Sequence, residues 1–118
     1  MTDYSWAITK GDSDYISISV INADTNQPVN ITDSTIYFTV KKSSADLDES
    51  AVIQKVITEH VNATGGLSKI ELSSDDTDLD IGRYIYDIVI AFLSGERQHL
   101  VTPSAFVISQ TVKEVKNA

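Results

Sequence analysis

The chain contains no cysteine among its 118 residues. This absence excludes disulfide bonds, thiolate metal sites and cysteine nucleophiles, and it fits a reducing compartment. Basic residues are scarce too, because nine Lys and Arg stand against 17 Asp and Glu and give a formal net charge of -8. Binding to nucleic acid or to an anionic membrane surface needs a basic footprint, so the sequence predicts neither kind of partner.

Long apolar runs are also missing. No segment approaches the ~20 apolar residues of a membrane-spanning helix. Residues 1–6 lack both the basic start and the apolar core of a signal peptide, so we expect a soluble protein made inside the cell. The length suits one domain, and we expect residues 1–118 to fold as a single unit, with residues 1–4 and 113–118 as flexible or partner-contacting ends.

The longest apolar segment covers residues 84–92 and alternates with a period of two. One face carries only aromatic and branched side chains, namely Tyr84, Tyr86, Ile88, Ile90 and Phe92. Successive side chains of a β-strand point to opposite faces, so the pattern predicts a long strand that is buried on one face and partly covered on the other. Shorter runs of this kind occur at residues 6–9, 15–20, 36–40, 52–57, 67–72, 99–101 and 106–108. Seven or eight strands, with turn signals every ~8–12 residues, predict an all-β sandwich or barrel.

The start of the long strand carries the pattern Asp80-x-Gly82-x-Tyr84. It resembles the tyrosine corner of immunoglobulin-like sandwiches, in which a Tyr hydroxyl bonds to the backbone just upstream of a central strand. Tyr86 stands where an antibody-type domain has a cysteine, so the resemblance supports the sandwich and not an antibody domain. We expect an immunoglobulin-like antiparallel β-sandwich, with a positive φ angle at Gly82.

Candidate catalytic and metal-binding groups are few and scattered. His60 and His99 lie far apart and have no cysteine to complete a zinc site, so we expect solvated or edge-strand histidines. The sequence has neither a Gly-x-Ser-x-Gly elbow nor an EF-hand loop. Acidic clusters at residues 12–14, 46–49 and 75–80 offer oxygens for a structural calcium ion, but Asp and Ser also form turns by bonding to local backbone. We therefore expect no enzyme and no cofactor, with calcium in these Asp-rich loops as the less favoured alternative.

Three residues are candidates for contacts with a partner. Tyr4 and Trp6 are aromatic residues near the start of the chain, and aromatic residues are enriched in interface hot spots. Their alternative role is to close the end of the sandwich. Asp87 interrupts an apolar face of the long strand, where a charge costs energy unless it is solvated or paired. We expect Asp87 to lie on a solvated face or to pair with a cation. The alternative is that Asp87 belongs to an interface or a functional site. The candidate cations are Lys41, Lys55 and Arg83.

Several short motifs follow one another in a familiar order. They are Lys10-Gly11-Asp12, residues 28–32, residues 34–40, Asp76-Thr77 followed by residues 82–88, Ser94-Gly95-Glu96, and residues 106–108. Their order resembles the N-terminal domain of the baseplate upper protein of tailed phages, and related small tail-associated immunoglobulin-like domains. The likeness extends from about residue 8 to residue 112.

The resemblance implies a non-enzymatic structural or adaptor protein of a phage virion, made in the host cytoplasm and placed in the tail, baseplate, neck or capsid. Its partners would be other virion proteins and further copies of itself in a symmetric homo-oligomer, through edge-strand pairing and loop contacts. The alternative is a carbohydrate- or host-surface-binding β-sandwich module, for which one Trp provides little stacking surface. A hydrolase on a β-scaffold is the last hypothesis, since a sandwich alone does not decide function.

Overall fold

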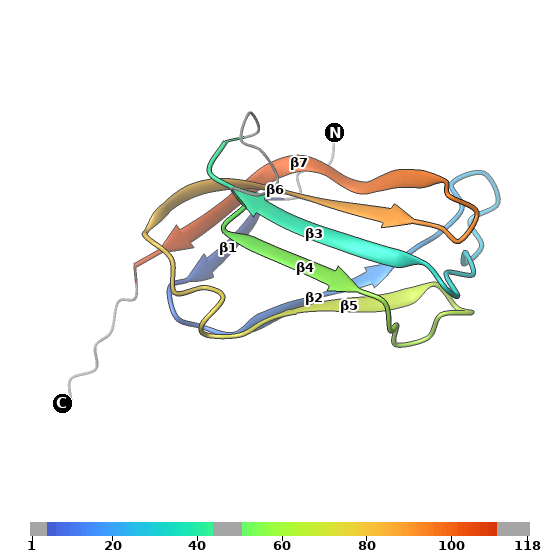
Figure 1. Ribbon diagram of the computed structural model, residues 1–118, viewed down its shortest axis with the longest axis horizontal. Coiled ribbons are helices and arrows are strands. Elements are labelled where there is room, and N and C mark those ends of the chain that lie inside the picture. The colour runs from blue at the N-terminus through green and yellow to red at the C-terminus, as the bar shows by residue number, and fades with distance from the viewer. Residues whose placement is uncertain (1–4, 44–50, 111–118) are drawn as a thin grey trace.

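The computed structural model describes residues 5–43 and 51–110 and has an all-β architecture (Figure 1). Within these ranges the strands are β1 (Trp6–Thr9), β2 (Asp14–Ser19), β3 (Thr35–Lys41), β4 (Ile53–Ile57), β5 (Leu67–Leu72), β6 (Gly82–Ala91) and β7 (Arg97–Ser109). No helix long and apolar enough to cross a bilayer occurs among the described residues. The all-β class and a count of seven strands, both predicted from the sequence, are confirmed.

The strands form two sheets. The larger has the order β1-β7-β6-β3-β4, and the smaller consists of β2 and β5. Neighbouring strands are antiparallel except β1 and β7, which run parallel with Trp6 opposite Phe106. In Figure 1 the smaller sheet lies below the larger one. β6, which contains most of the long apolar segment, is the middle strand of the larger sheet.

The core lies between the two sheets and is made by alternate residues of each strand. β6 and β3 contribute more buried core residues than the other strands do, namely Tyr84, Tyr86, Ile88, Ile90, Ile36, Phe38 and Val40. The smaller sheet covers these residues with Ile18, Ile70 and Leu72. Most intervening residues of β3 and β6 are at least partly exposed, and Val89 is the buried exception. The predicted division of the long strand into a buried face and a partly covered face is therefore confirmed.

Four aromatic rings meet in the core. They belong to Trp6, Phe38, Tyr86 and Phe106, and their centroids lie 5.4–6.3 Å apart in tilted or edge-to-face pairs. Such pairs contribute beyond the area that they bury, by about 0.5–1.5 kcal/mol each. The cluster joins β1, β3, β6 and β7, so it holds together strands that are far apart in the sequence.

β7 passes through Pro103 without a break, but its register with β6 shifts there. Tyr86 lies opposite Ser104 and Ile88 opposite Val101, so two β7 residues lie opposite Asp87 alone. Proline cannot donate to a strand ladder, and a bulge is a position that tolerates this loss. The bulge therefore accommodates Pro103, and residues 99–101 and 106–108, two separate runs in the sequence, belong to one strand.

Candidate functional site

Tyr84 fixes the entry of the chain into β6. Its side chain is 4% exposed, and its hydroxyl donates a hydrogen bond of 2.7 Å to the backbone oxygen of Asp80. Burial raises the pKa of this hydroxyl, and the nearby Asp80 carboxylate adds to the rise against the opposing effect of Lys10. The hydroxyl therefore stays protonated and able to donate at neutral pH.

Gly82 has a φ angle of 157°, positive as expected, and residues other than glycine rarely adopt this backbone conformation. A Cβ built on Gly82 meets no atom within 4 Å, so the backbone conformation and not local packing favours glycine at this position. Gly66 has both constraints, because its φ angle is 74° and its Cβ would lie 2.7 Å from two backbone oxygens.

We expect Tyr84→Phe to lower the free energy of unfolding by about 0.5–1.5 kcal/mol, because it removes one hydrogen bond and keeps the ring. Urea denaturation measures the change. Tyr15→Phe is the matched control, since the Tyr15 side chain is 58% exposed on β2. Equal stability changes in the two variants would show that the Tyr84 hydroxyl contributes nothing.

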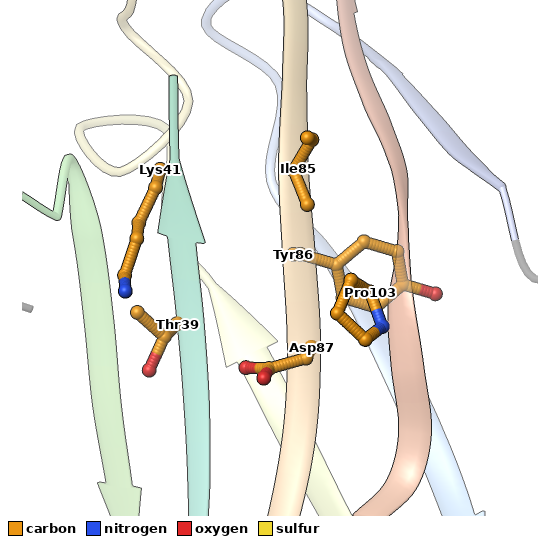
Figure 2. A pocket seen from close by; sticks show the side chains of 6 residues that line it. All are labelled: Thr39, Lys41, Ile85, Tyr86, Asp87 and Pro103. Carbon is orange, nitrogen blue, oxygen red and sulfur yellow. The ribbon is translucent and has the colours of Figure 1, made fainter. Parts of the chain in front are cut away.

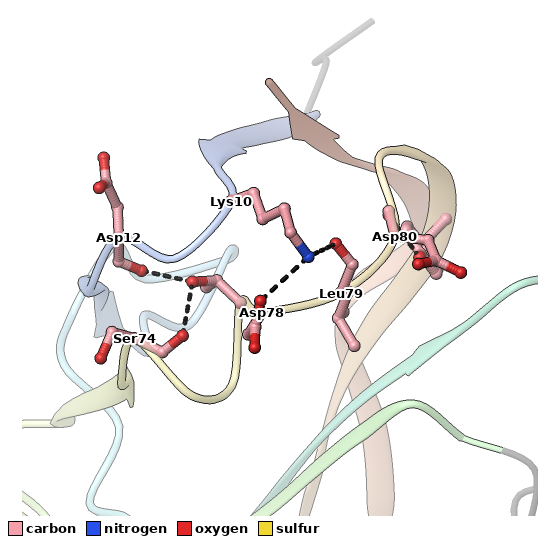
Figure 3. A network of polar contacts seen from close by, with 8 residues as sticks. Lys10, Asp12, Ser74, Asp78, Leu79 and Asp80 are labelled. Carbon is pink, nitrogen blue, oxygen red and sulfur yellow. Dashed lines mark hydrogen bonds and ion pairs between the residues drawn. The ribbon is translucent and has the colours of Figure 1, made fainter. Parts of the chain in front are cut away.

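The acidic loop before β6 is organised by bonds to its own backbone and to the β1–β2 turn. The N–H of Ser73 donates to Asp76 Oδ2 at 2.8 Å, and the N–H of Asp76 donates to Ser73 Oγ at 3.2 Å. The fully buried Thr77 donates from its hydroxyl to the backbone oxygen of Asp12 at 2.6 Å. Figure 3 shows Lys10 reaching the same loop, with Nζ 2.8 Å from the Leu79 oxygen.

Two carboxylates of this loop form ion pairs. Lys10 Nζ lies 3.0 Å from Asp78 Oδ1, and Lys55 Nζ lies 2.8 Å from Asp76 Oδ2. Within the described ranges, no group of three or more His, Asp or Glu side chains is placed to hold a metal ion. The acidic cluster at residues 46–49 lies outside those ranges.

Asp76 makes stability depend on pH. Burial opposes its ionisation, but hydrogen bonds from Lys55 and Ser73 and the Lys55 charge outweigh burial and hold the pKa of Asp76 below its usual value. A depressed pKa in the folded state means that the ionised group stabilises the fold above the unfolded pKa of about 3.9. This stabilisation is lost as the pH falls through the folded pKa.

We therefore expect Asp76→Asn to unfold at lower urea concentration than the parent at pH 7, and the difference to shrink as the pH falls below about 4. Urea midpoints measured at several pH values give the difference. Asp75→Asn, in the same loop, is the control and should show no such convergence. A difference for Asp76→Asn that is independent of pH would contradict this role.

His60 forms a polar bridge to two buried serines. Its Nδ1 lies 2.9 Å from Ser68 Oγ, and its Nε2 lies 3.0 Å from the backbone oxygen of Ser34. A carbonyl only accepts, so Nε2 carries a hydrogen and donates to Ser34. His60 is partly buried and both of its ring nitrogens have protein partners, so the expectation of a solvated or edge-strand histidine is wrong for His60. Ser34 and Ser68 are almost fully buried, so this bridge ties a loop to β5 inside the fold.

Asp87 and His99 meet on the outer face of the larger sheet. Asp87 Oδ2 lies 3.1 Å from His99 Nε2, so Asp87 has a partner that is not among the predicted cations. Lys55, one predicted partner, pairs with Asp76 instead. Figure 2 shows Asp87 beside Thr39 of β3, in a hollow of ≈ 70 Å³. Ligand pockets usually measure ~300–1,000 Å³, so this hollow is too small for one.

The aromatic candidates at the start of the chain have different outcomes. The ring of Trp6 packs in the aromatic core cluster, and its Nε1–H donates to Asp14 Oδ2 at 3.3 Å. This position corresponds to the alternative role, in which Trp6 closes the end of the sandwich. Tyr4 lies outside the described residues. Partner contacts by Tyr4, Trp6 and Asp87 stay predictions.

A groove of ≈ 1210 Å³ runs between β2 and the first half of β7. Its lining from β2 and the following loop spans residues 16–24, and its lining from β7 is Gln98, His99, Leu100 and Val101. β1 pairs with β7 only from Phe106 to Ser109, so the beginning of β7 is left uncovered on this side among the described strands. The sequence pattern does not identify this groove, because it depends on which strands pair across the molecule.

Comparison with known proteins does not place this chain in a family. No protein-family model matches it, and no curated protein matches it significantly. The geometry of the exposed strand edges and the groove is therefore the basis on which a function can be proposed.

Proposed function

We propose that this chain is an immunoglobulin-like β-sandwich that acts without catalysis, as a structural or adaptor protein of a tailed-phage virion. The observation that carries the proposal is a pair of uncovered strand edges, on β2 and on residues 97–105 of β7. Neither edge has a neighbouring strand within the described part of the chain. Uncovered edges are templates for pairing with another chain, so this surface suits protein–protein assembly.

The immunoglobulin-like part of the proposal is supported by the strand order. When β2 to β7 are named B, C, C′, E, F and G, the pairings become B–E in one sheet and G–F–C–C′ in the other. This is the distribution of strands in variable-type immunoglobulin sandwiches. Tyr84 then lies near the start of strand F with its hydroxyl bonded to Asp80, which is the position of a tyrosine corner.

The non-catalytic part is supported by what the buried polar groups do. His60, Ser34 and Ser68 bond to one another, and Thr77 bonds to backbone oxygens. Each of these contacts links a loop to a strand or to another loop, which is a structural task. Catalytic histidines and hydroxyls must instead reach a substrate.

The virion assignment is supported by the order of short motifs from Lys10-Gly11-Asp12 to residues 106–108, which resembles tail-associated domains of phages. Partners are then other virion proteins and further copies of this chain in a symmetric assembly. Carbohydrate binding is the weaker alternative, because stacking on a sugar needs aromatic rings exposed in a binding groove. The ring of Trp6 packs against Phe38 and Phe106, and the exposed Tyr15 does not line the groove between β2 and β7.

Immunogold labelling of phage particles from the organism that encodes the chain tests this function. An antibody against the purified chain should label every particle at one fixed location of the tail, baseplate, neck or capsid. Native mass spectrometry of the purified chain should show a closed oligomer. Unlabelled particles, in a lysate whose soluble fraction contains the chain, would overturn the virion role.

A further inference from the structure

The groove between β2 and β7 combines an apolar floor with a strand edge that no other described strand covers. Ile18 and Ile88 are buried at its base, and Leu100 and Val101 contribute half-buried side chains. Ile21 and Leu93, at 50% and 77% exposure, also line it. Large exposed apolar side chains around an apolar floor are typical of a surface that another chain covers.

The backbone of β2 is available along this groove. The N–H of Val20 donates to Gly66 on the β5 side, and hydrogen-bonded pairs alternate along an antiparallel ladder. Ile16 and Ile18 therefore also direct their backbone groups to β5, while Ser17 and Ser19 direct theirs to the open side. The N–H of Tyr15 also points to the open side, where it donates a hydrogen bond of 2.8 Å to Oδ1 of Asp14.

Other strand edges carry charged residues, a proline or a bulge, which discourage pairing with another chain. β5 presents the exposed ion pair of Lys69 and Glu71, and β4 presents Lys55. The uncovered edge of β7 contains Pro103 in a bulge, which leaves β2 as the better edge for pairing. Charges, proline and bulges are the usual protection of an edge strand, but the centre of β2 has two small uncharged serines instead.

The charge of the groove indicates what kind of chain fits. Its lining includes the carboxylates of Asp24 and Glu96 and no lysine or arginine. Neither carboxylate has a cationic partner among the described residues, and Glu96 accepts only a neutral hydrogen bond from Gln98. A basic residue near these carboxylates would complement them. A second copy of a chain with a net charge of -8 would add repulsion.

We propose that the groove binds an extended segment of a different protein, which adds as a third strand along the Ser17–Ser19 edge of β2. Alternate apolar side chains of that segment lie on the floor at Ile18, Ile88 and Leu100, and a Lys or Arg lies beside Asp24 or Glu96. The added strand turns a two-stranded sheet into a three-stranded one, which is a more stable unit. The proposal rests on the proposed adaptor role only for the expectation that the partner is a virion protein.

A titration with a model strand tests the site. The probe is a short capped peptide of alternating Val and Thr with a Lys at each end, added to the ¹⁵N-labelled full chain and followed by NMR. We expect saturable shifts at Ser17, Ser19 and the groove-lining residues of β7. The absence of saturable shifts in this region would overturn the proposal.

Two altered peptides separate strand addition from simple apolar contact. A peptide N-methylated at alternate residues keeps its side chains and loses its edge donors, so it should bind at least about tenfold more weakly. A peptide with Glu at both ends should also bind more weakly than the Lys-ended one. Equal binding of the N-methylated peptide would overturn strand addition, and equal binding of the Glu-ended peptide would overturn the charge preference.

Variants of the chain provide the matching evidence. Glu96→Gln and Asp24→Asn should weaken binding of the Lys-ended peptide, whereas Asp75→Asn, in a different loop, should not. Groove shifts that appear when the protein concentration alone is raised would show that a second copy occupies the groove, and would overturn the proposal of a different partner.

The two proposals fail separately. Saturable binding by a chain that is missing from phage particles would support the groove site and overturn the virion role. If the chain is present at a fixed location in particles but its groove does not respond to any of the peptides, the virion role is supported and the groove site is overturned.

Discussion

Gly66→Ala is expected to lower the free energy of unfolding by about 2–5 kcal/mol. Two costs add at this position. The φ angle of 74° is left-handed, which costs a residue with a Cβ about 1–2 kcal/mol. The new Cβ would also lie 2.7 Å from the backbone oxygens of Val20 and Val29, so the backbone must shift, at about 1–3 kcal/mol. The N–H of Val20 bonds to Gly66 itself, so the shift reaches the end of β2.

Gly11→Ala is the matched control for this prediction. Gly11 has a similar φ angle of 83°, but a Cβ there meets no atom within 4 Å. Gly11→Ala should therefore lower the free energy of unfolding only by the cost of the left-handed backbone conformation, about 1–2 kcal/mol. Urea unfolding of both variants gives the difference. Equal losses would show that the close approach of Gly66 to the two backbone oxygens has no energetic consequence.

Phe38→Ala is expected to lower the free energy of unfolding by about 3–5 kcal/mol, the usual range for removing a fully buried aromatic ring. Phe38 is fully buried and contacts three other rings, so its loss leaves a cavity between β1, β3, β6 and β7. Thermal and urea unfolding measure the change.

Tyr37→Ala is the control, because the adjacent residue lies on the opposite face of β3. The ring of Tyr37 is half-buried there and lies 5.4 Å from the Arg97 guanidinium carbon. Tyr37→Ala should therefore lower the free energy of unfolding clearly less than Phe38→Ala does. If the two variants are equally destabilised, the core does not lie on the side of the larger sheet described above.

The strands could be predicted from the sequence because each has a local signal. The alternation from Tyr84 to Ile90 is visible without any knowledge of neighbouring strands, and the turn at Gly95 is marked by its own residues. The bond from the Tyr84 hydroxyl also spans only four residues, from Asp80. Features that depend on a few neighbouring residues can be read from the chain directly.

Features that depend on pairing between distant strands could not be predicted in this way. His60 bonds to Ser34, which is 26 residues away, and no motif connects them. The partner of Asp87 is set by the register of β6 with β7, where a bulge brings His99 within 3.1 Å. The groove exists because β1 pairs with only the last part of β7, and nothing in the composition of β1 indicates where that pairing stops.

Residue-resolved amide hydrogen exchange tests most directly that β6 is the centre of the fold and that the β2 edge is free to accept a partner strand. The amides of β6 from Tyr84 to Ile90 should be among the slowest to exchange, because strands cover both sides. Along β2, Ile18 and Val20 should be protected while Ser17 and Ser19 exchange fast. Protection of Ser17 and Ser19 equal to that of Ile18, or rapid exchange throughout β6, would contradict this account.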